Sequence, residues 1–337
     1  MRRLALLALV GMLLPLAVWG QVAAPSLVPA SPGVADPTLT KDPTLVPTNP
    51  ATLGWPQATR LAAGIVRADR QQPSSNIKDG AGDTIVKNPA ISTQYEGSYA
   101  GGVYRGERYG IAAETLTIRD TGSPDAPLDD FRHNAAFGYA LSDRFAVGTG
   151  ASFDSDRQDN NHKRTTGISA GASMRLGERW YVGGVVGHES SEQHAINASG
   201  SDGNATSTIL VAGVGYVTEG SLRMHIEAAA GTIQITGDSQ QAVSAQLQTV
   251  SVEALYKSWV FGLGFLAAHG SFKADAGAND LTWTSGEATV GVVPEHGFGV
   301  LYHYGFGAAR AKLTFDPFTS QVDTLAKTHS LTVVWQY

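Results

Sequence analysis

Apolar residues alternate with small or polar residues along the chain from about residue 59 onward. One stretch places Phe131, His133, Ala135, Phe137 and Tyr139 between Arg132, Asn134, Ala136 and Gly138. A period of two puts alternate side chains on opposite faces of a strand, whereas a helix repeats every 3.6 residues. The pattern therefore predicts an all-β chain.

About fourteen such segments can be counted, and each is long enough to cross a bilayer as a tilted strand, which takes roughly 9–11 residues. They begin near Leu61, Tyr95, Tyr109, Phe131, Arg144, Thr165, Trp180, Thr206, Leu222, Ala242, Trp259, Leu281, Phe298 and Thr328. In 109–119 and 242–257 the apolar row changes parity, which predicts a β-bulge in each of these two strands.

The connections between these segments alternate strictly in length. The short ones are 104–109, 141–144, 176–180, 218–221, 256–259 and 294–297. Longer polar segments lie between them, such as 119–130, 154–166, 190–207 and 312–329. Short turns on one rim and long loops on the other are typical of transmembrane barrels, whose short turns face the periplasm.

The two faces of the strands favour a membrane barrel over a soluble sandwich. One row is dominated by Gly, Ala and Ser and has few of the charged residues that a water-facing surface carries. The other row is apolar, as lipid requires, and closure removes the strand edges that a bilayer would not tolerate. Aromatic residues near the turns predict an interfacial girdle: Tyr104, Tyr109, Phe145, Trp180, Tyr181, Tyr256, Trp259 and Phe298. The prediction is a transmembrane antiparallel β-barrel of about 14 strands over residues 59–337.

Two further segments precede the predicted barrel. Residues 1–20 combine Arg2 and Arg3 with a short apolar run and end in small residues, which predicts a signal peptide and export. Residues 21–58 hold eight of the 15 Pro in the chain and should be extended or irregular. We expect this zone to be a periplasmic or luminal plug segment.

Composition argues against several other classes of function. A formal charge of −6 gives no basic surface for nucleic acid. Cysteine is absent, the nine His form no pair with zinc-ligand spacing, and no Gly-x-Ser-x-Gly sequence occurs. The sequence therefore predicts no enzyme, no cofactor and no metal site.

The ending "HSLTVVWQY" resembles the C-terminal signal of Gram-negative outer-membrane proteins. Leu331, Val333, Trp335 and Tyr337 form the alternating apolar row with its terminal aromatic residue. The resemblance implies recognition by the barrel-assembly machinery, location in the cell outer membrane, and contact with outer-membrane lipid.

The strand count together with "NPATLGW" resembles the long-chain fatty acid transporter (FadL/OmpP1-like) family. The resemblance implies that Asn49, Pro50 and Ala51 belong to a segment that plugs the lumen from the periplasmic side. It implies a channel or transporter for small hydrophobic molecules. A non-transporting structural or docking barrel that serves secretion or surface partners, and a general porin for hydrophilic solutes, are the alternatives.

Ionisable residues on the inner row form a candidate luminal polar cluster. They are Arg132, Arg175, Arg223, His225, Glu227, Glu253, Glu287 and His303. Because buried charges must be compensated, these side chains either pair across the lumen and hold the plug or line a path for substrate or ions.

Overall fold

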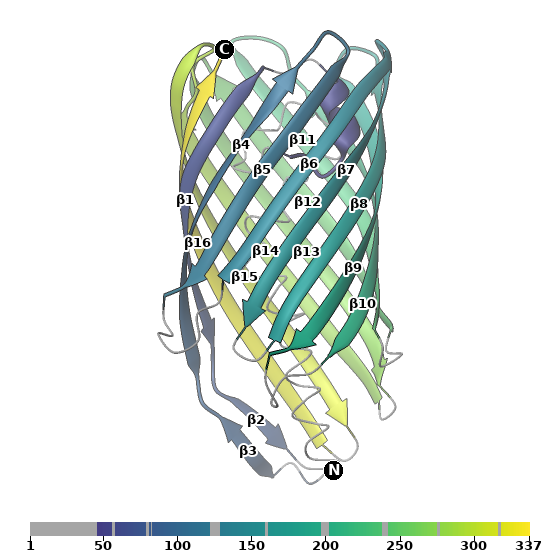
Figure 1. Cartoon of the computed structure of the whole chain (residues 1–337), viewed down its shortest axis with the longest axis vertical. Helices are drawn as coiled ribbons and strands as arrows, with labels where there is room; N and C mark the ends of the chain where they lie inside the picture. Colours follow the sequence, from purple (N-terminus) through teal and green to yellow (C-terminus); the bar gives the residue numbers. More distant parts are fainter. Residues whose placement is uncertain are drawn as a thin grey trace.

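The computed structural model is a closed antiparallel barrel in which each strand of the wall pairs with the next wall strand along the chain, and the last pairs with the first (Figure 1). The structure describes residues 46–55, 58–78, 81, 83–121, 129–158, 161–196, 202–237, 242–274, 277–315 and 318–337. The predicted signal peptide lies outside these residues. Among the described residues, no helix has the length and apolar character needed to span a membrane.

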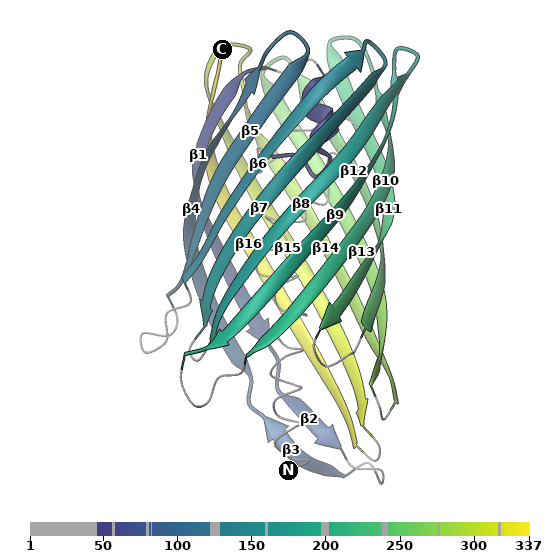
Figure 2. The ribbon, with the colours of Figure 1, turned by 45° about the vertical axis from the view of Figure 1, so that its right-hand side comes forward.

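Fourteen strands form the barrel wall. They are β1 (Arg60–Gln72), β4 (Ile91–Arg105), β5 (Tyr109–Asp120), β6 (Asp129–Ser142), β7 (Phe145–Gln158), β8 (Asn161–Leu176), β9 (Trp180–Ala195), β10 (Gly203–Val217), β11 (Leu222–Gly237), β12 (Ala242–Tyr256), β13 (Trp259–Ala274), β14 (Gly277–Val292), β15 (Gly297–Phe315) and β16 (Phe318–Gln336). A short 3-10 helix, η1 (Pro50–Gly54), lies inside the barrel (Figures 1 and 2). The predicted fold class is confirmed.

All six predicted short turns connect strands at one end of the barrel, which also holds Tyr337 (Figure 1). We call this end the short-turn rim and the opposite end the long-loop rim. The prediction of long loops was partly wrong, because 154–166, 190–207 and 312–329 contain much more strand than expected. Residues 312–329 in particular belong to the hairpin of β15 and β16, which pair from Gly297 and Gln336 down to Phe315 and Phe318.

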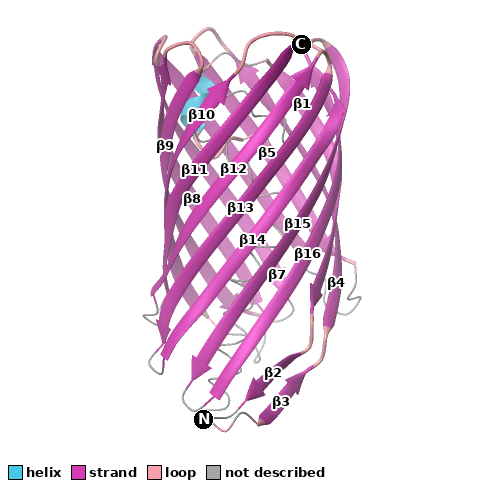
Figure 3. Ribbon diagram, turned by 180° about the vertical axis from the view of Figure 1, so that it is seen from behind, coloured by secondary structure: helices cyan, strands magenta, loops and turns pink. Residues whose placement is uncertain are grey.

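Two short strands that the alternation did not predict extend the sheet beyond the long-loop rim. The strands β2 (Ser75–Lys78) and β3 (Thr84–Asn88) form a hairpin, and β2 pairs with β16 at Thr319 and Ser320. Figure 3 shows this hairpin beside the ends of β15 and β16, below the barrel wall.

The outer surface changes from apolar to polar along each strand. On β13 the outward side chains from Trp259 to Ala267 are apolar, and His269 follows them on the same face. On β11 the outward row changes from Ile226 to Thr232 and Gln234. Lipid-facing bands of membrane barrels are about 25 Å tall. The strands are longer than this band requires, so polar strand extends past it, which is why the sequence pattern there resembled loops.

The inner surface becomes more apolar toward the long-loop rim, where the outer surface becomes polar. Leu116 and Ile118 on β5 and Leu247 on β12 are buried on the inward face, farther from the short-turn rim than the outward apolar residues. The pairing of β5 and β12 is continuous, and the bulges predicted in 109–119 and 242–257 are absent from these described strands. The parity change in the sequence therefore marks apolar side chains that move from the lipid face to the lumen face.

Most of the predicted aromatic girdle faces outward near the short turns, with Phe298 exposed at 74% and Tyr104 at 53%. Tyr181 is an exception, since its ring faces the lumen and meets Trp55 edge-on with 6.2 Å between ring centroids. Its assignment to the girdle was wrong because Trp180 and Tyr181 are consecutive and only one of them can face lipid.

The C-terminal aromatic residue provides a first testable prediction. Tyr337 is 55% exposed, and its backbone N–H donates to the Thr59 carbonyl over 3.2 Å, so it makes few contacts that would stabilise the finished barrel. If it acts in assembly, Tyr337→Ala should strongly lower the amount of heat-modifiable barrel in cells, yet leave refolding of the purified chain into lipid vesicles unchanged. Tyr256→Ala removes another exposed girdle tyrosine and serves as the control. Equal cellular yields of the two variants would contradict an assembly role.

Candidate functional site: the luminal helix and the adjacent cavity

The loop that carries η1 is held together by the side chain of Asn49. Its Oδ1 accepts from the backbone N–H of Ala51 over 3.1 Å, and Thr52 Oγ1 donates to the Asn49 carbonyl over 2.9 Å. Pro50 occupies the first helical position, where its missing N–H costs nothing. Asn49 Nδ2 donates to the carbonyl of Ala172 on β8, so one amide both caps the helix and fixes it to the wall.

Four glycines on neighbouring strands form the surface on which η1 rests. Gly110, Gly138, Gly148 and Gly171 are direct cross-strand partners in series on β5, β6, β7 and β8. A Cβ at any of them would clash with Leu53, Pro50, Ala51 or Asn49. Glycine is needed here because two backbones approach closely. This row, which we call the glycine row, allows η1 to pack flush against the inner wall.

Contacts on both sides of η1 complete its attachment. Trp55 Nε1 donates to Ser173 Oγ on β8 over 2.9 Å, and the indole packs against Tyr181. Before the helix, the backbone N–H of Val46 donates to Glu114 Oε2 on β5 over 3.3 Å. All residues of η1 are buried.

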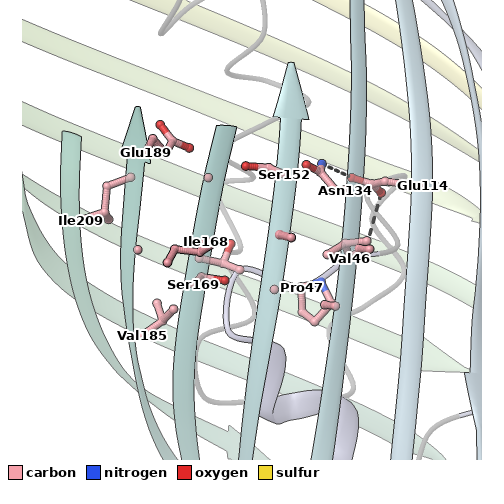
Figure 4. Close-up of a pocket in the computed structure, with 17 residues that line it drawn as sticks. Val46, Pro47, Glu114, Asn134, Ser152, Ile168, Ser169, Val185, Glu189 and Ile209 are labelled. Atoms are coloured by element: carbon pink, nitrogen blue, oxygen red, sulfur yellow. Dashed lines mark hydrogen bonds between the residues drawn. The ribbon is translucent and has the colours of Figure 1, made fainter. Parts of the chain in front are cut away.

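A cavity of about 200 Å³ lies next to this segment, between Val46–Thr48 and the inner faces of β5 to β10 (Figure 4). Its apolar wall includes Val46, Pro47, Val185 and Ile209, and the other lining residues include small residues and the polar side chains of Glu114, Asn134 and Glu189. Along the strands its lining lies farther from the short-turn rim than the glycine row does. The cavity is therefore on the long-loop side of η1.

Two groups of buried apolar side chains line the lumen on this same side. One comprises Val185, Val211, Ala229 and Leu247 on β9 to β12, with Ile209 and Ile233 packed against it. The other comprises Ala68, Tyr95, Leu116 and Ile118 on β1, β4 and β5. An inner surface of this kind offers an apolar molecule a favourable environment compared with water.

The predicted luminal polar residues do not form one cluster. Near the short-turn rim, His225 and Glu253 are buried cross-strand partners, Glu227 is buried nearby on β11, and Glu287 lies on β14. His303 is buried on β15 and its Nδ1 lies 2.6 Å from Thr289 Oγ1.

The three predicted arginines have separate environments. Arg175 donates to the Glu178 carbonyl at the short-turn rim, and Arg223 is exposed on β11. Arg132 lies toward the long-loop rim, where its Nε donates to Asp154 Oδ2 over 2.9 Å.

A second group of inward charges, which the alternation does not reveal, lies at the long-loop end of β6 to β8. Asp130, Asp154 and Asp156 are buried, and Lys163 lies within electrostatic range of the latter two. The sequence predicts loops at these positions because the strand ends there are polar on their outer face as well. Within the described part of the chain, no group of His, Asp and Glu has the geometry to hold a metal ion.

Comparison with known proteins places this architecture among membrane barrels. Residues 144–269, which extend from the start of β7 into β13, match the family model described as autotransporter beta-domain. No curated protein sequence matches the chain.

Two solved structures share the fold at low sequence identity. A Pseudomonas aeruginosa FadL homologue has a TM-score of 0.52 and 10% identity, covering 91% of this chain and 97% of that chain. The P. putida toluene transporter TodX has a TM-score of 0.50 and 10% identity, covering 86% of this chain and 93% of that chain. The chain thus resembles, in its closed fourteen-stranded fold, the FadL-type outer-membrane barrels.

Proposed function

We propose that the protein is an outer-membrane channel that passes small hydrophobic molecules through a lumen plugged by the η1 segment. The observation that carries this proposal is the cavity of about 200 Å³ beside η1, with Val46, Pro47, Val185 and Ile209 on its wall. The apolar luminal surfaces on β9 to β12 and on β1, β4 and β5 support it, since they continue from the cavity's level toward the long-loop rim.

The arrangement suits stepwise passage of a solute. A solute enters at the long-loop rim, moves along the apolar inner surface and reaches the cavity, where η1 and Trp55 stand between it and the short-turn rim. The lipid-facing band and the resemblance of the ending to an outer-membrane signal support placement in the outer membrane with the short turns in the periplasm. The P. putida protein of similar fold is a toluene transporter, which agrees with a hydrophobic substrate.

A second candidate function is a barrel that serves secretion or surface partners. The match of residues 144–269 to the autotransporter beta-domain model favours it. In that case the lumen would conduct neither small apolar solutes nor ions. Partners would contact the part of the sheet that extends beyond the long-loop rim, which β2, β3, β15 and β16 form. Uptake measurements on the purified barrel separate the two functions.

The channel hypothesis predicts that filling the cavity blocks uptake. Val185 is buried at 5% exposure and lines the cavity, so Val185→Trp should place an indole in the space that the solute needs. Uptake of toluene into vesicles containing the barrel should fall at least tenfold, because the indole would occupy the cavity of about 200 Å³ that the solute needs.

The matched control is the next residue of the same strand. Val186 faces lipid at 48% exposure, so Val186→Trp adds the same side chain outside the lumen and should leave uptake unchanged. Heat-modifiability confirms that both variants fold. Equal uptake by the two variants, or an absence of toluene uptake by the unmodified barrel, would exclude the proposed path.

A further inference from the structure

The ionisable groups in the described lining of the cavity beside η1 are all of one sign. Seventeen residues line it, and two of them, Glu114 and Glu189, are acidic while none is basic (Figure 4). In Figure 4 the two carboxylates come from different strands and stand on opposite sides of the lining. A purely hydrocarbon ligand would gain nothing from either group, since carboxylates in an apolar site cost free energy unless a donor or cation meets them.

Of the two carboxylates, Glu189 is the one better placed to bind a ligand. It lies on β9 with its side chain turned inward, half-buried, and its Oε2 accepts from Ser207 Oγ over 3.2 Å. The described base within electrostatic range is Lys163, which does not line the cavity and which also serves Asp154 and Asp156. Among the described residues of this part of the lumen, the two bases Lys163 and Arg132, the latter paired with Asp154, are outnumbered by the carboxylates of Asp130, Asp154, Asp156 and Glu189.

Glu114 adds to the negative potential while holding the η1 segment. Its Oε1 accepts from Asn134 Nδ2 over 2.8 Å and its Oε2 accepts from the Val46 backbone N–H. These two contacts orient the carboxylate between β6 and the η1 segment.

We propose that this cavity selects small apolar molecules that carry a positively charged amine, with Glu189 as the residue that determines specificity. The inference rests on the proposed function, because it names the substrate class of the same cavity. An ammonium group would meet Glu189 while its apolar part packs against Val185 and Ile209. A carboxylate-bearing solute of the same size would be repelled, since like charges in a low-dielectric site interact strongly.

The volume restricts the size of such a ligand. A dry engineered cavity of about 150 Å³ accommodates benzene. A cavity of about 200 Å³ therefore has room for one aromatic ring with a short aminoalkyl group. Benzylammonium is a suitable probe, and benzyl alcohol and benzoate are its neutral and anionic counterparts of similar size.

Binding to the full-length barrel in detergent micelles tests the proposal directly. By titration calorimetry, benzylammonium should bind at least tenfold more tightly than benzoate, with benzyl alcohol between them. Glu189→Gln keeps the shape of the side chain and should weaken benzylammonium binding roughly tenfold, as the loss of one charge-assisted contact does. Glu192→Gln is the control: it lies on the same strand, its side chain is 63% exposed, and it faces outward beside His194.

The outcomes separate this inference from the proposed function. Equal affinities for the three probes, or a Glu189→Gln variant that binds benzylammonium as tightly as the Glu192→Gln variant, overturn the inference even if toluene uptake works as proposed. Selective benzylammonium binding that depends on Glu189 supports it, including in a barrel that takes up no toluene, where the channel proposal alone would fail.

Discussion

Replacing Gly148 by valine should release the η1 segment and open the lumen. Gly148 is central in the glycine row, between Gly138 and Gly171, and any Cβ there would collide with the backbone of Pro50 and Ala51. Neither backbone can yield without breaking the Asn49 cap or moving η1 away from β7. Overpacking of this kind costs about 1–3 kcal/mol, which changes the ratio of unplugged to plugged barrels by roughly 5- to 150-fold.

Conductance of single barrels in planar bilayers measures this effect. We expect Gly148→Val to show frequent or permanent open states, whereas the unmodified barrel is mostly closed. Gly307→Ala is the matched luminal control, because a Cβ at Gly307 on β15 would meet its nearest neighbour at an ordinary 3.7 Å. A Gly148→Val barrel that is folded yet as closed as the Gly307→Ala barrel would show that η1 does not obstruct the lumen.

A charge placed in the middle of the lipid-facing band should strongly destabilise the barrel. Leu263 on β13 lies between Phe261 and Phe265 on the outward face and is 68% exposed. Leu263→Lys should lower the free energy of unfolding by about 2–4 kcal/mol, the cost of a lysine near the bilayer midplane. Denaturant unfolding of the barrel in lipid vesicles measures the change.

The control for this substitution is on the same face of the same strand. His269 is exposed three outward positions farther toward the long-loop rim, beyond the apolar row. His269→Lys should cost about 0–1 kcal/mol, as lysine does at the membrane interface. Similar losses at both positions would mean that the apolar row does not mark the membrane.

The barrel architecture could be predicted from local patterns because those patterns have local causes. Side-chain alternation has a period of two in any strand, and a short turn such as 141–144 must join adjacent antiparallel strands. Two predictions were wrong for the same reason, namely the long polar loops and the two β-bulges. The strands continue past the apolar band, so their polar outer rows in 154–166 and 312–329 resembled loops, and their inward apolar residues such as Leu116 and Leu247 resembled shifts of register.

Only part of the candidate site could be predicted from the sequence. The expectation that the Pro-rich zone is extended or irregular was wrong at Pro50–Gly54, which form a helical turn capped by Asn49, because Pro is tolerated at the first helical position. The inner row indicated which ionisable residues face the lumen. Which of them lie together could not be predicted, because inward neighbours such as His225 and Glu253 are brought together by pairing between β11 and β12.

The sequence by itself determined the class of fold, the number of strands in the barrel wall, the rim at which the short turns lie and the outward face of most of the girdle aromatic residues. Only the tertiary structure decided which side chains and segments contact the faces of the strands. The register of β5 to β8 aligns Gly110, Gly138, Gly148 and Gly171, which are far apart in the chain, into one row that accepts η1. The same closure brings Glu189 and Val185 to the cavity beside Val46. The physical reason is that alternation depends on each strand alone, whereas register and luminal contact depend on how all the strands pair around the closed barrel.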